Sequence, residues 1–140
     1  MELTRFDLDG IRQDNLRGVS GEEFSAVWLA AEARGDELVA AGSPSDFVAG
    51  VQSACRWIAN GFSRSAETGL LDNVASPITG RKSVAYAELI ETEALAAEAE
   101  VKNPGDIGRA AYLAGVWATF AWSWRHSGVP PVRLTEHKAS

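Results

Sequence analysis

The sequence has little of the material from which most catalytic and metal-binding sites are built. Its 140 residues include one cysteine and two histidines. No phosphate-binding loop, G-x-G-x-x-G or G-x-S-x-G motif occurs. The histidines, His126 and His137, stand near the end of the chain and form none of the Glu-x-x-His pairs of a di-iron bundle. These absences exclude the common nucleophilic and nucleotide-binding motifs, and we expect no cofactor.

Long hydrophobic runs and paired cysteines are also missing. The single cysteine, Cys55, has no partner for an internal disulfide, and its place in the apolar pattern of an expected helix predicts a small buried side chain. The uncharged run 110–124 is too short to cross a bilayer. The segment 1–7 is charged and contains no apolar stretch typical of a secretory signal. We therefore expect a cytoplasmic protein.

Positive charge is scarce, because 13 lysine and arginine residues stand against 19 acidic ones, for a formal net charge of −6. A field of this sign repels the phosphate backbone, which disfavours general nucleic-acid binding, and it attracts basic partners. Arginine outnumbers lysine, a composition typical of GC-rich bacterial genomes.

Two parts of the sequence resemble each other. Leu-Ala-Ala-Glu-Ala at 29–33 recurs at 95–99, and Ala-Gly-Val at 49–51 recurs at 114–116. Each Ala-Gly-Val is followed by a tryptophan, Trp57 or Trp122. An Ala- and Glu-rich chain produces short matches by chance, but these keep their order and nearly the same separation. They indicate an internal repeat of one helical hairpin.

The repeat predicts an all-α, four-helix bundle-like single domain. The predicted domain consists of an irregular N-terminal arm (1–19), a first hairpin (20–61), a long loop (62–82), a second hairpin (83–127) and a C-terminal tail (128–140).

Local signals predict where the helices begin and end. Ser20 and Glu23 have the spacing of a capping box, and Gly42 ends a helix over about 20–41. Ser43 and Pro44 begin the second helix, with the proline at its first position. The third helix, about 83–102, is amphipathic. The fourth, about 106–127, is apolar on every side and must be covered by its neighbours or by a partner.

The loop 62–82 has no periodicity and is long for a compact domain, which is typical of a mobile or functional segment. This loop contains Arg64, Arg81 and Lys82, and arginine and tryptophan residues occur at the ends of the second and fourth helices. Such cations stabilise a helix C-terminus, and together they also suit an anionic ligand or an acidic partner surface. The candidate partner-binding residues are Arg56, Trp57, Arg64, Arg81, Trp122, Trp124 and Arg125.

The glutamates support a different hypothesis. Glu88 and Glu91 lie one turn apart on the third helix, where two carboxylates can share a divalent cation, and we expect Glu22, Glu23 and Glu32 on the first helix to face them. This arrangement resembles the all-α nucleotide pyrophosphohydrolases, whose helices present acidic residues to magnesium and a triphosphate. The chain departs from that family's E-E-x-x-E and E-x-x-D motifs, because Ala26 stands at the third glutamate and Glu91 has no aspartate partner.

Because no catalytic constellation is complete, the sequence predicts a non-enzymatic regulator, inhibitor or adaptor. We expect it to bind another protein, or a second copy of itself, through the fourth helix and the 62–82 loop. Two alternatives stay open. One is the magnesium-dependent nucleotide hydrolase that the resemblance implies, and the other is a binder of a small apolar ligand in a cleft between the hairpins.

Overall fold

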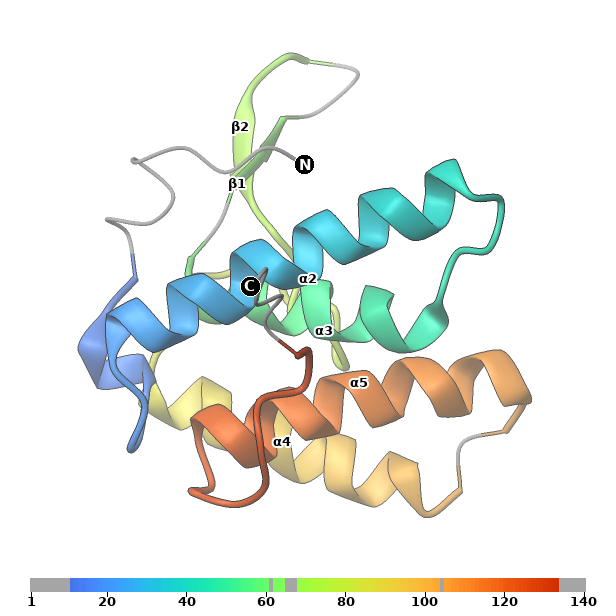
Figure 1. Cartoon of the computed structure of the whole chain (residues 1–140). Helices are drawn as coiled ribbons and strands as arrows, with labels where there is room; N and C mark the ends of the chain where they lie inside the picture. The colour runs from blue at the N-terminus through green and yellow to red at the C-terminus, as the bar shows by residue number, and fades with distance from the viewer. Residues whose placement is uncertain (1–10, 61, 65–67, 104, 134–140) are drawn as a thin grey trace.

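The computed structural model describes residues 11–60, 62–64, 68–103 and 105–133 (Figure 1). The helices are α2 (Gly21–Ala40), α3 (Asp46–Ile58), α4 (Ala87–Val101) and α5 (Ile107–Ser123), preceded by the short 3-10 helix η1 (Gln13–Asn15). The strands β1 (Phe62–Arg64) and β2 (Leu71–Asn73) form an antiparallel ribbon between α3 and α4. The predicted all-α, bundle-like domain of two helical hairpins is confirmed. Residues 1–10 of the predicted arm and 134–140 of the tail lie outside the described residues.

Polar side chains fix the starts of α2 and α3. Ser20 Oγ accepts the backbone N–H of Glu23, and the Glu23 carboxylate accepts that of Ser20 in return, which confirms the predicted capping box. The cap of α3 is Ser45, whose hydroxyl accepts the N–H of Val48 at 3.1 Å. The prediction that Ser43 caps this helix was wrong, and α3 begins later than expected.

The centre of the fold is a close contact between α3 and α5. A Cβ atom at Gly50 would overlap the carbonyl oxygen of Tyr112, and one at Gly115 would overlap that of Phe47. Only glycine therefore lets the two backbones approach this closely. Each glycine is the middle residue of a repeated Ala-Gly-Val segment, so the two contacts mirror each other. They relate the hairpins by an approximate two-fold axis between α3 and α5.

The helices follow from this central pair. α3 and α5 run side by side in the same direction, α2 packs on α3, and α4 packs on α5 (Figure 1). The ends of α2 and α4 and the starts of α3 and α5 all lie at one end of the bundle (Figure 1). Because the α3 and α5 backbones touch at Gly50 and Gly115, no ligand cleft separates the hairpins at this crossing.

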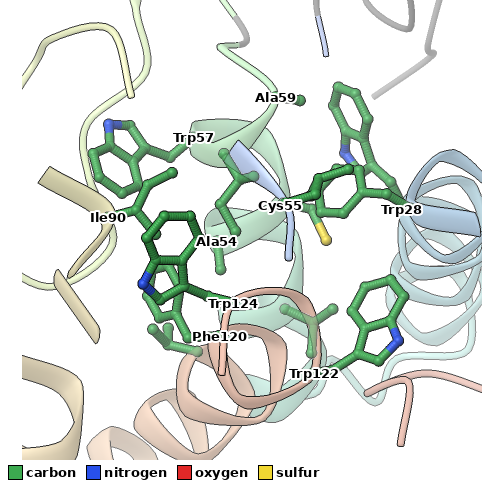
Figure 2. Close-up of a cluster of buried hydrophobic side chains, with 14 of the residues drawn as sticks. Trp28, Ala54, Cys55, Trp57, Ala59, Ile90, Phe120, Trp122 and Trp124 are labelled. Atoms are coloured by element: carbon green, nitrogen blue, oxygen red, sulfur yellow. The ribbon is translucent and has the colours of Figure 1, made fainter. Parts of the chain in front are cut away.

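Aromatic side chains fill the space around the crossing. Trp28, Trp57 and Trp124 are fully buried, and Cys55 is buried within the same cluster as predicted. In Figure 2, Trp57 and Trp124 lie on one side of α3, whereas Trp28 and Trp122 lie on the other. Each large apolar side chain removed from water contributes about 1.5–3 kcal/mol. The core therefore extends around the central helices rather than forming a separate cluster in each hairpin.

The segment 62–82 contains structure that periodicity did not predict. β1 and β2 pair with Ser63 opposite Asp72, and the ribbon projects from the helices (Figure 1). Farther along, Ala75 forms an isolated bridge with Lys82. Strands of three residues are too short for a recognisable alternation of apolar and polar residues.

A buried glutamate holds the end of this segment on the bundle. The carboxylate of Glu93 in α4 is 2% exposed and accepts the backbone N–H of Ile78 at 2.8 Å, together with the N–H and hydroxyl of Thr79. The hydroxyl of Tyr112 in α5 donates to the carbonyl of Pro77 at 2.9 Å. This turn is therefore fixed against both helices of the second hairpin.

Two further helix ends differ from prediction. α4 begins at Ala87 instead of about 83, because the N–H of Ala85 donates to Asn60 Oδ1 and its carbonyl accepts from Asn15 Nδ2. These non-helical partners keep the preceding backbone extended. α5 ends at Ser123 instead of about 127, and His126 adopts a left-handed φ of 55° that does not continue a helix.

We expect Gly50→Ala and Gly115→Ala each to lower the free energy of unfolding by about 1–3 kcal/mol, because the added methyl group forces the two backbones apart. Chemical denaturation measures this effect. Gly21→Ala is the control, since a Cβ atom there approaches only the Gln13 side chain, at 3.9 Å; we expect a change within about 0.5 kcal/mol. Equal stability of the three variants contradicts the close crossing.

Candidate functional site

The three tryptophans predicted to bind a partner are buried inside the chain. Trp57 and Trp124 are 1% exposed and Trp122 is 8% exposed. Trp57 Nε1 donates to the carbonyl of Ser83, and the ring of Trp122 stacks on Phe24 with the centroids 6.0 Å apart. These rings belong to the core and do not provide a surface that is ready for a partner.

Arg56 is held in an internal ion pair between α2 and α3. Its Nε and Nη2 atoms each lie 2.7 Å from a carboxylate oxygen of Glu32, which also accepts Trp28 Nε1 at 3.1 Å. The hydrogen bond to Glu32 raises the pKa of Arg56 above its ordinary value. Burial, and then the charge of Glu32, raise the pKa of the neighbouring Cys55 thiol. The thiol therefore stays protonated and unreactive.

Arg125 has a similar role at the other hairpin. Its Nη2 lies 3.1 Å from Oε2 of Glu91 in α4, and Oε1 of the same carboxylate accepts Trp124 Nε1 at 2.8 Å. The guanidinium of Arg17 lies over the Trp124 ring, 3.7 Å from its centroid. These contacts attach the end of α5 to α4 and neutralise the charge of Arg125.

The two remaining candidates belong to the 62–82 segment. Arg81 is exposed beside the bridge, and Arg64 is in β1, where its side chain lies outside the described part of the structure. Arg56 is at the α2–α3 contact and Arg125 at the α4–α5 contact. The described residues therefore do not assemble the predicted basic and aromatic patch.

The glutamates of the alternative hypothesis do not converge. Glu22 and Glu23 are exposed at the start of α2, Glu88 is exposed on α4, and Glu91 is bound to the end of α5. Within the described ranges, no group of three or more His, Cys, Asp or Glu side chains is placed to hold a metal ion. The four carboxylates therefore do not form the magnesium site that the resemblance implied.

The structure instead reveals one apolar side of α5 that the described residues leave partly open. Ile107 is 89% exposed and Ala114 is exposed, while the other members are half-buried. Steps of three and four residues place all of them on one side of the helix. We call this surface the α5 face: Ile107, Ala110, Ala111, Ala114, Trp117, Ala118 and Ala121. No helix in the described ranges, α5 included, is long and apolar enough to span a membrane.

The α5 face is most open near the start of the helix. A shallow hollow of about 670 Å³, wide open to solvent, lies there, lined by Gly105, Asp106, Ile107, Gly108 and Ala110. Toward the other end, residues 124–133 turn back across the front of the bundle in Figure 1, and Val132 packs against the core. The more accessible half therefore includes Ile107 and Ala114.

The two-fold relation supplies an internal comparison for this face. The positions on α3 that correspond to Ala111, Ala114, Trp117, Ala118 and Ala121 are Asp46, Ala49, Gln52, Ser53 and Arg56. Ala49 is exposed like Ala114, and the three that follow it are half-buried like their counterparts. The α3 residues make polar contacts: Gln52 Nε2 donates to the Ala31 carbonyl, for example, at 3.1 Å. The same position in the fold is therefore polar on α3 and apolar on α5.

Sequence reasoning missed the α5 face because the fourth helix is apolar on all sides. Its tryptophans were the most prominent residues, whereas the open side consists mostly of alanine. The available signal was the comparison between repeats, since alignment of the two Ala-Gly-Val segments places Gln52 opposite Trp117 and Arg56 opposite Ala121. No protein-family model, curated protein or solved structure matches this chain.

We expect Arg56→Met to lower the free energy of unfolding by about 3 kcal/mol, because it leaves the buried Glu32 carboxylate without its cation. Arg125→Met is the matched comparison. Its partner Glu91 is 41% exposed, so solvent screens the pair and we expect a loss of about 1 kcal/mol or less. Denaturant titration measures both. Equal losses of stability contradict the conclusion that the buried Glu32–Arg56 pair matters more than the solvent-screened Glu91–Arg125 pair.

Proposed function

We propose that this chain is a non-enzymatic interaction protein, a regulator, inhibitor or adaptor, that binds another protein through the α5 face. The observation that carries the proposal is an open helix side without a polar residue, in a position where α3 is polar. Contiguous exposed apolar surface marks an interaction site in many proteins. The half-buried Trp117 is of the residue type that most often contributes strongly to binding.

The fourth helix thus remains the proposed contact, but its open side replaces the buried tryptophans. The β1–β2 ribbon is a less favoured contact, because it projects from the α2 and α3 side of the bundle rather than from the α5 side (Figure 1). A cytoplasmic location, also proposed, is consistent with a single unpaired cysteine.

A photo-crosslinking amino acid at position 114, compared with the same residue at position 49, tests this function. Both sites are exposed alanines in equivalent places on α5 and α3. In cells that produce the protein naturally, we expect a discrete adduct with another protein at position 114 and none at 49. Mass spectrometry identifies the adduct.

Addition of Ile107→Glu is expected to abolish the adduct at position 114, because a charge then stands at the most exposed apolar position. Val39→Glu is the control, since Val39 is also an exposed aliphatic residue, at 66%, but lies on α2. Identical adducts at positions 49 and 114, or no adduct at either, contradict the proposed function.

A further inference from the structure

The α5 face has the spacing of a coiled-coil seam. Ile107, Ala111, Ala114, Ala118 and Ala121 follow each other by alternating steps of four and three residues. This is the a and d pattern along which one helix packs against another. The seam extends for about 20 Å at 1.5 Å per residue. Its geometry favours a helix over an extended peptide or a flat surface.

Alanine along the seam favours close approach of the two backbones. The same chain uses small residues in this way at the crossing of α3 and α5, where glycine is required. Because alanine side chains contribute little contact area, the bulky side chains must come from the other helix. The shallow hollow beside Ile107 is open to solvent and offers such a side chain a contact surface.

Charges at the open end of the face specify the partner further. A Cβ atom at Gly108 would lie 3.2 Å from Asp46 Oδ2 and 3.5 Å from Asp106 Oδ1, so both carboxylates lie beside the hollow. Both residues are exposed. Arg109 is nearby, but its guanidinium is paired with Glu100 at 2.9 Å. The edge of the hollow is therefore acidic, in a protein with a net charge of −6.

We infer that the α5 face binds a basic amphipathic α-helix of another protein, with bulky apolar side chains on one side and Lys or Arg at its edges. This inference rests on the proposed function and names its partner class. Lysine or arginine at the edge of such a helix pairs with Asp46 and Asp106. A second copy of this chain fits less well, because it brings another acidic edge and another −6 charge to the contact.

A pair of synthetic peptides tests the inference on the full chain. One is a helix roughly five turns long with leucine at a and d positions and lysine elsewhere, and the other has glutamate in place of lysine. Fluorescence anisotropy measures binding of each labelled peptide. We expect the lysine peptide to bind and the glutamate peptide not to bind. Equal binding of the two peptides overturns the basic character of the partner.

Matched variants locate the binding site. Ala114→Glu is expected to weaken binding of the lysine peptide at least about tenfold, whereas Ala49→Glu, with the same charge change on α3, weakens it less than about twofold. Circular dichroism verifies that both variants are folded. If both variants weaken binding equally, or if neither weakens it, the assignment to the α5 face is overturned.

The double variant Asp46→Asn, Asp106→Asn removes the acidic edge, and asparagine retains the capping ability of Asp106. We expect about threefold weaker binding and a smaller dependence on salt concentration. An unchanged salt dependence overturns the role of these carboxylates. Light scattering provides a further check, because a dimer that Ala114→Glu disperses assigns the face to a second copy instead.

The two proposals fail in different ways. An adduct at position 114 with an acidic or non-helical segment overturns the basic helix but leaves the interaction function intact. Absence of an adduct together with absence of peptide binding overturns both.

Discussion

The fold depends on the contact between the backbones of α3 and α5 at Gly50 and Gly115. Because neither residue has a side chain, the peptide groups of one helix lie against those of the other. Such proximity fixes the relative position of the two helices more tightly than side-chain packing does, since rotamers cannot adjust there. The outer helices α2 and α4 then pack on a rigid pair, and the aromatic core forms around it (Figure 2).

The mirrored glycines also separate structural requirements from functional ones. The sides of α3 and α5 that face each other must satisfy the same packing in both repeats. The opposite sides carry no such constraint, because each lies beyond the contact. On α3 this outer side carries Gln52 and Arg56, which bond to Ala31 and Glu32 of α2. On α5 it is apolar. Where packing does not dictate the residue type, a difference between the two repeats is the place to expect a function that belongs to one hairpin.

The sequence predicted the fold better than the site. The repeated segments and the capping box at Ser20 depend on local residues, so they indicated the hairpins and the start of α2 correctly. The start of α4 was predicted too early, because the extended backbone at Ala85 depends on hydrogen bonds to the distant Asn15 and Asn60. The burial of Trp122 and Trp124 inside the chain was not predictable either. A helix that is apolar all round has no polar side to show which way it faces.

The ion pairs explain why the predicted patch of arginines does not assemble in the described residues. Glu32 and Glu91 each accept hydrogen bonds from one arginine and one tryptophan. Glu32 thereby connects the helices of the first hairpin and Glu91 those of the second. Each carboxylate also pairs with the positive charge of its arginine, Arg56 or Arg125. The charges left beside the α5 face are mainly acidic. Alanine contributes little area, so most binding free energy must come from Ile107, Trp117 and the partner's own side chains. Such a surface suits a reversible complex better than a permanent one, because obligate interfaces bury larger and more hydrophobic areas.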